Sequence, residues 1–177
     1  MMSLFKSKKR QPLDLKAAVI AGGAAGIVSG LVKLGWENVL PPRTEERDAT
    51  NPPQTLLEQF GVPAKVTHAT YHYSGHELPW VSYVIHFGFS TTFAVLYQII
   101  GEKLPAVKKD AGTWFGLAIW VAFHLGIMPL MGTVPAPENQ PKEEHISESL
   151  GHVAWMVTND LVGTEVYRRL VAEKNKQ

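Results

Sequence analysis

Two long stretches of the chain contain no charged side chain. The first lies between Glu77 and Glu102, and its most apolar part is 79–100. A helix over 79–100 would be roughly 30 Å long, which is the thickness of the hydrocarbon core of a bilayer. The second stretch, 111–137, predicts another such helix over 113–131. Two such helices in 177 residues leave too little chain to cover both with soluble layers, so the pattern predicts an integral membrane protein.

Two further spans complete the predicted bundle. An apolar run follows the basic N-terminal residues, and no small-residue cleavage site with a polar start comes after it, so it predicts an uncleaved span over 17–36. The fourth span, 149–170, is the least hydrophobic, because it includes Asn159, Asp160 and Glu165. Such side chains are costly in lipid, so we expect this helix to face protein over much of its surface.

The remaining segments are polar and divide the chain around one membrane domain, 17–171. We predict a basic tail over 1–16, an external loop over 37–78 and a short tail over 172–177. In the loop, Asn51 precedes two prolines, which is typical of a helix N-cap and first turn, and predicts a short amphipathic helix at the membrane surface. The predicted fold class is all-α: an integral membrane bundle of four transmembrane helices with a short interfacial helix in the first external loop.

The overall charge excludes some classes of partner. Seventeen basic and sixteen acidic residues give a net charge of +1, which provides no bulk attraction to nucleic acid, so no nucleic-acid partner is expected. The chain contains no cysteine, which excludes disulfides, thiolate metal sites and cysteine nucleophiles.

The distribution of lysine and arginine predicts the orientation. With four spans, the side that holds both termini carries twelve basic residues and the other side carries four. The twelve are Lys6, Lys8, Lys9, Arg10, Lys16, Lys103, Lys108, Lys109, Arg168, Arg169, Lys174 and Lys176, and the four are Arg43, Arg47, Lys65 and Lys142. Because positive loops stay in the cytoplasm, both termini are predicted to be cytoplasmic.

Ionisable side chains gather in the outer half of the predicted bundle. His86 and His124 each lie seven residues from the outer end of a span, which places them about 10 Å below the surface. Glu148, His152 and Asn159 follow helical spacing and share one face. Ionisable groups are costly inside a membrane, so each one is a candidate functional residue. The candidate ion-pathway or pH-sensing residues are Lys33, Glu37, His86, His124, Glu148, His152, Asn159 and Asp160.

Two other patterns predict helix packing and, as an alternative, metal binding. Gly22, Gly26 and Gly30 recur every four residues, the stripe that lets helices approach closely in lipid, and this predicts a homo-oligomer in the lipid bilayer. A zinc site is an alternative use of the polar residues His76, His86, His124, Glu148 and His152. Their spacing is scattered, and no HExxH motif or phosphate-binding loop is present, so no catalytic residue is assigned and no other cofactor is expected.

Several motifs together resemble the YagU-like bacterial inner-membrane proteins. They are AGIVSGLVKLGWE with the following PPR (25–43), GHELPW (75–80), HFGFSTTFAVLY (86–97), HLGIMPLMGTVP (124–135) and SESLGHVAWMVTND with a terminal RR (147–169). The resemblance covers about 17–170. It implies a multi-span protein of the bacterial inner membrane, a family association with acid tolerance and no established reaction. The family's motif positions include Lys33, Glu37, Arg43, His76, His86, His124, Glu148 and His152.

Three functions remain open on this basis. The leading hypothesis is a pH-sensitive channel or transporter for protons or small cations, because histidine titrates between pH 5 and 8. The alternatives are a zinc-dependent membrane hydrolase and a non-catalytic structural or assembly protein of the membrane.

Overall fold

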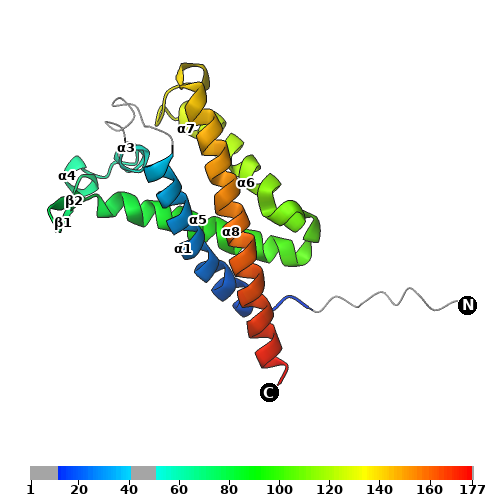
Figure 1. The fold of residues 1–177 in the computed structure, drawn as a ribbon. Helices are drawn as coiled ribbons and strands as arrows, with labels where there is room; N and C mark the ends of the chain where they lie inside the picture. The colour runs from blue at the N-terminus through cyan, green and yellow to red at the C-terminus, as the bar shows by residue number, and fades with distance from the viewer. Residues whose placement is uncertain (1–11, 41–50, 177) are drawn as a thin grey trace, which may run out of the picture.

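The computed structural model describes residues 12–40 and 51–176. Most of the predicted basic tail, together with Arg43 and Gln177, lies outside the described residues. The described chain is built almost entirely from helices, as predicted, and one small β-hairpin interrupts them (Figure 1).

Within residues 12–40 and 51–176, three helical segments are long and apolar enough to cross a membrane. They are α1 (Leu15–Val39), α5 (Trp80–Lys103) and the composite segment Pro105–Leu130. The composite segment consists of a 3-10 helix, η1 (Pro105–Gly112), α6 (Thr113–Trp120), a π-helix, η2 (Val121–Ile127), and α7 (Met128–Leu130). The predicted fourth span belongs to α8 (Lys142–Lys174), which is longer than expected and more polar than the other three.

The helices run alternately up and down. The side chain of Lys174 donates a hydrogen bond to Asp14 at 2.6 Å, so the start of α1 and the end of α8 lie together. Along α5, Val95 faces Gly22 and Phe87 faces Gly30, so α5 is antiparallel to α1. We call the end of the bundle where Asp14 and Lys174 meet, near the C mark in Figure 1, the terminal end, and the opposite end of α1 and α8 the hairpin end.

The glycine stripe packs α1 against α5 within the chain. A Cβ at Gly22 would lie 2.5 Å from the Cα of Val95, and one at Gly26 would meet the Cα of Thr91. The stripe is therefore a helix contact, as the spacing predicts, but its contact face is occupied by α5 of the same molecule. The homo-oligomer stays a prediction, and it has to rest on another surface.

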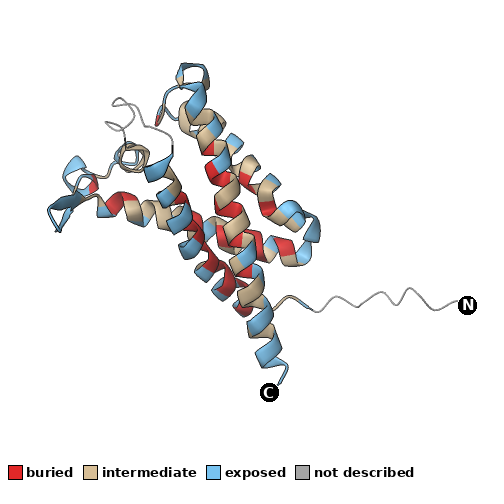
Figure 2. Ribbon diagram, in the orientation of Figure 1, coloured by how far each residue is buried: buried red, intermediate tan, exposed pale blue. Residues whose placement is uncertain are grey.

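Helix α8 packs on the face of α1 next to the glycine stripe and buries the face predicted to avoid lipid. Glu148, His152 and Asn159 are 7%, 4% and 1% exposed, which confirms that this face is covered by protein. Trp155 and Met156 lie on the same side and form the apolar core with Tyr97 of α5. Figure 2 shows the buried positions concentrated along the facing sides of α1 and α8.

The segment between α1 and α5 folds back onto the bundle. It contains α3 (Pro52–Gln59), α4 (Ala64–Thr67) and the antiparallel strands β1 (Tyr71–Tyr73) and β2 (His76–Leu78). The predicted N-cap of α3 is confirmed, since the Asn51 side chain accepts a hydrogen bond from the backbone N–H of Gln54. The location of α3 at the membrane surface stays a prediction. A short 3-10 helix, η3 (Pro137–Asn139), precedes α8.

Candidate functional site

A charged cluster joins α1, η2 and α8 near the hairpin end; its members are Lys33, Glu37, His124, Glu148 and His152, of which Lys33, Glu148 and His152 are buried. The Lys33 ammonium donates to Glu148 Oε2 at 2.8 Å and to Glu37 Oε1 at 2.5 Å. Lys33 is 6% exposed, so its charge is removed from solvent and depends on these carboxylates. The α1–α8 packing thus brings Glu148 of α8 to the Lys33–Glu37 pair of α1.

His152 is held in one tautomer by its own helix. Its Nδ1 lies 2.8 Å from the backbone carbonyl of Glu148, and a carbonyl only accepts, so Nδ1 carries the proton. In the neutral ring Nε2 is then the acceptor. The ring packs edge-on to that of His124, with the centroids 5.0 Å apart. The pair is therefore arranged so that one histidine can respond to the protonation of the other.

His124 reaches the cluster from the middle of the π-helix η2. Single π turns widen a helix and are frequent at functional sites, and this one brings His124 Nε2 to 3.8 Å from Glu148 Oε2. Gly116, two turns earlier, allows α6 to approach α8 closely, because a Cβ there would lie 2.7 Å from the carbonyl oxygen of His152. The π-helix and the glycine together position this histidine.

Three members of the cluster could hold a metal ion. The ligand atoms of His124, Glu148 and His152 all lie within 4.8 Å of one another. The hydrogen bond from His152 to a carbonyl is the kind of support that orients a metal-binding imidazole. Against metal binding, Lys33 already donates to the same Glu148 oxygen that faces His124.

The structure separates the other predicted site residues from this cluster. His76 lies exposed on β2, and His86 of α5 donates from Nε2 to the carbonyl of Gly30 at 2.9 Å. The predicted five-residue metal set is therefore brought together only in part. Asp160 accepts a hydrogen bond from the Tyr97 hydroxyl at 2.8 Å, and Asn159 is buried about two turns beyond His152.

Several polar contacts between α1, α5 and α8 were not predicted. The Trp36 indole donates to the Ser147 hydroxyl at 3.1 Å and links α1 to α8. The Trp155 indole donates to Ser90 Oγ at 2.8 Å, and Ser90 donates to the carbonyl of Gly26. Gln98 is fully buried in α5, and the signal for it was available, because an amide in an apolar span is unusual.

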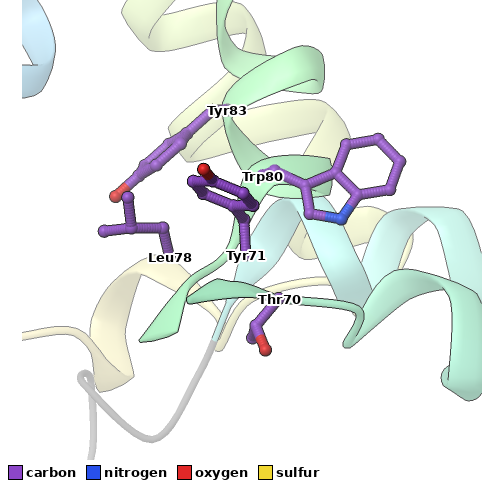
Figure 3. Close-up of a pocket in the computed structure, with 5 residues that line it drawn as sticks. All are labelled: Thr70, Tyr71, Leu78, Trp80 and Tyr83. Carbon is purple, nitrogen blue, oxygen red and sulfur yellow. The ribbon is translucent and has the colours of Figure 1, made fainter. Parts of the chain in front are cut away.

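The hairpin forms an aromatic pocket at the start of α5, away from the cluster. Figure 3 shows its lining residues, which are Thr70, Tyr71, Leu78, Trp80 and Tyr83. Close by, the Thr70 hydroxyl and then the His72 imidazole hydrogen-bond to Glu77 and hold the pKa of this carboxyl below its ordinary value. These bonds stabilise the hairpin, and the pocket contains no ionisable member of the charged cluster.

The long apolar helices and the buried ionisable cluster define a helical membrane protein. The chain belongs to the family described as "Protein of unknown function (DUF1440)", whose model matches residues 27–161. It is 28% identical to "Inner membrane protein YagU" of Escherichia coli (strain K12) over 198 aligned positions, which cover 99% of this chain and 97% of that protein. The resemblance to YagU-like proteins is thereby confirmed. No solved structure matches the chain.

Proposed function

We propose that this protein is a pH-sensitive channel or transporter for protons or small cations in the bacterial inner membrane, linked to acid tolerance. In this arrangement α8 is the fourth span, α3 lies at the outer membrane surface and both termini are cytoplasmic. The charged cluster then lies in the outer half of the membrane. The name of the relative supports a location in the inner membrane. The excess of lysine and arginine at the terminal end supports the cytoplasmic location of both termini.

The charge balance of the cluster is the observation that carries this proposal. Glu37 and Glu148 contribute two negative charges and Lys33 one positive charge, so the cluster has a net charge of −1 when its histidines are neutral. A net negative charge favours the protonated form of nearby imidazoles, and one added proton or small cation would cancel it. The ionisable groups that contact one another in this region are Lys33 and Glu37 of α1, His124 of η2, and Glu148 and His152 of α8.

His124 and His152 are the groups on which an added proton would reside. Imidazole changes its charge between pH 5 and 8, and both rings lie beside the carboxylate of Glu148. Lys33 stays charged and keeps the two carboxylates in place. Acidification on the outer side would therefore add a proton to the cluster. Release of this proton toward the cytoplasm would complete a transport step.

Flux into proteoliposomes containing the full chain tests this proposal. His124→Ala and His152→Ala should each lower proton or cation flux about tenfold and flatten its dependence on pH. His76→Ala is the matched control, because His76 is exposed on the hairpin. Wild-type flux in both cluster variants would contradict the mechanism.

One observation favours a second candidate, a zinc-dependent membrane hydrolase. His124, Glu148 and His152 offer three ligand atoms, and three protein ligands with an open position are typical of catalytic zinc. Metal analysis of the purified protein separates the candidates. Zinc bound at one equivalent and lost in His152→Ala would support the hydrolase, whereas substoichiometric metal would remove it.

A further inference from the structure

The hairpin formed by β1 and β2 has two different faces. Cross-strand partners in an antiparallel pair lie on the same face. One face carries His72 and Glu77, which hydrogen-bond to each other at 2.7 Å. The other face is mostly aromatic and apolar, and its side chains are Tyr71, Tyr73, His76 and Leu78. We call this second side the aromatic face, and the hairpin is therefore amphipathic.

The aromatic face is exposed on the surface of the protein. Tyr71 and Tyr73 are 60% and 64% exposed, and their rings stack with the centroids 6.4 Å apart. Trp80, which lines the same pocket as Tyr71, is 44% exposed. Single apolar residues on a surface need no explanation, but a group of large aromatic side chains rimmed by polar ones marks an interaction site. A hairpin of two short strands is also barely stable in water by itself, and a surface packed against it would stabilise it.

The aromatic face continues directly into a helix that can cross a membrane. Only Pro79 separates Leu78, at the end of β2, from Trp80, the first residue of α5. Helix α5 is long and apolar enough to span a bilayer, so its first turn lies where the bilayer begins. In that turn Ser82 donates a hydrogen bond to Asn51, the N-cap of α3, at 2.9 Å. The start of α5 therefore joins the polar segment to the span, and the headgroup region of the bilayer is the surface that lies beside the aromatic face.

The pocket between the hairpin and α5 gives this surface a defined shape. Its volume is about 510 Å³, and Figure 3 shows Tyr71 of the hairpin beside Trp80 and Tyr83 of α5. The lining side chains carry no charge and present mainly carbon, with the tyrosine hydroxyls as hydrogen-bond donors. The neutral part of a phospholipid has matching chemistry, because its acyl carbons adjoin ester oxygens that accept hydrogen bonds. Tyrosine and tryptophan are enriched at this level of membranes because their rings are apolar and their tips are polar.

We propose that the aromatic face is a phospholipid-binding surface, which lies in the headgroup region beside α5 and holds the glycerol and the first acyl carbons of one phospholipid in the pocket. The exposed rings of Tyr71 and Tyr73 then lie among the headgroups, and the opposite face with His72 and Glu77 points toward water. Bound in this way, the hairpin fixes the level of α5 in the bilayer. The proposal does not rest on the proposed function, because it requires only that α5 crosses the membrane.

The absence of cysteine from the chain allows a spin label to be placed on each face in turn. In proteoliposomes containing the full chain, a nitroxide on Tyr73→Cys should collide more often with oxygen, which concentrates in lipid, and less often with a water-soluble nickel chelate. His72→Cys is the matched control, because His72 is the adjacent residue on the opposite face and is also exposed. The ratio of oxygen to nickel collisions should be at least about threefold higher at Tyr73→Cys. Equal ratios at the two positions overturn the proposal.

A second labelled position makes the result independent of one variant. Tyr71→Cys lies two residues earlier on the aromatic face and should give the same high ratio against the same control. The other occupant that could cover this face is a second copy of the chain. A second copy would exclude both reagents from Tyr73→Cys and bring two labels close enough for spin–spin broadening, and that outcome overturns the proposal.

Photo-crosslinking tests the pocket itself. A phosphatidylethanolamine with a diazirine near the ester end of one acyl chain should form adducts on Tyr83 of the wild-type protein, as mapped by mass spectrometry. Leu78→Trp places a bulky side chain in the pocket and should lower the yield of these adducts at least about fivefold. Val84→Trp is the control, because Val84 is exposed on α5 and is not among the lining residues. A wild-type protein without adducts on Tyr83, or equal yields in the two tryptophan variants, overturns lipid binding in the pocket.

Discussion

The Lys33 ammonium lies 2.8 Å from Glu148 Oε2, although 115 positions separate the two residues along the chain. Each comes from the buried face of a helix, and the second carboxylate, Glu37, lies one turn further along α1. Ion pairs of this kind are often no more stabilising than apolar residues of the same size. A buried pair beside two histidines is therefore better explained by what it does than by stability.

Removal of one partner should be more damaging than removal of both. Lys33→Met leaves Glu148 as a buried carboxylate without its cation and should destabilise the protein by about 3–5 kcal/mol. Lys33→Met with Glu148→Leu removes both charges, and Glu37, at 24% side-chain exposure, can be solvated. The double variant should recover at least half of the loss, measured as thermal unfolding in detergent.

The comparison of the single and double variants also distinguishes a functional ion pair from one that only holds the helices together. A double variant that is stable but has lost pH-dependent flux supports a functional pair. A double variant that is as unstable as the sum of the two single variants would show that the pair acts mainly in packing, as the structural or assembly hypothesis requires.

The glycine stripe gives a second prediction. Gly26→Ala places a methyl group against the backbone of Thr91 and should force α1 away from α5, at a cost of about 1–3 kcal/mol. Gly23→Ala adds the same methyl group on the open side of α1 and should raise stability slightly, because alanine favours helix. Thermal unfolding of both variants checks the sign, and equal effects would contradict the packing seen here.

Three of the four predicted spans coincide with helical segments long and apolar enough to cross a membrane, because apolar runs of that length are recognisable in the sequence. The fourth span, on α8, stays a prediction. The glycine spacing also predicted a helix contact, but spacing does not identify the partner helix, so α5 of the same chain was missed. The buried face of α8 was recognised because Glu148, His152 and Asn159 are costly in lipid. The sequence therefore identified which helix faces are covered by protein, but which helix covers each face is visible only in the packed structure.

Other parts of the site could not be predicted for physical reasons. The π-helix that carries His124 has no distinct residue pattern; it packs against α5 through Phe123 and Phe89 and against α8 through His124 and His152. The hairpin depends on a turn in which Ser74 and Gly75 adopt positive φ angles of 53° and 81°, and three-residue strands give little alternation. Asp160 has helical spacing close to the cluster but turns toward Tyr97 instead.

The hairpin should open in acid. Thr70 and then His72 hydrogen-bond to the ionised carboxylate of Glu77 and lower its pKa below the ordinary value of 4.5. The stabilisation is present above the ordinary pKa and is lost as the pH falls through the lowered one. The ¹³C shift of the Glu77 carboxyl should therefore titrate below pH 4.5, and Thr70→Ala should move the midpoint upward. An unchanged midpoint in that variant would contradict the role of the hydroxyl.

The last prediction concerns Glu148, the residue that contacts every other part of the cluster except Glu37. Glu148→Gln keeps the size of the side chain but removes one negative charge, so the cluster becomes neutral with both histidines unprotonated. A carboxylate within 4–6 Å favours a charged imidazole, so its loss makes protonation of the two histidines less favourable. The pH midpoint of flux should therefore fall by about one unit. Glu143→Gln is the control, since Glu143 is exposed in the first turn of α8. The two variants are compared by flux into proteoliposomes between pH 4 and 8. Equal midpoints in Glu148→Gln, Glu143→Gln and the wild-type protein would show that the cluster packs helices and does not respond to pH.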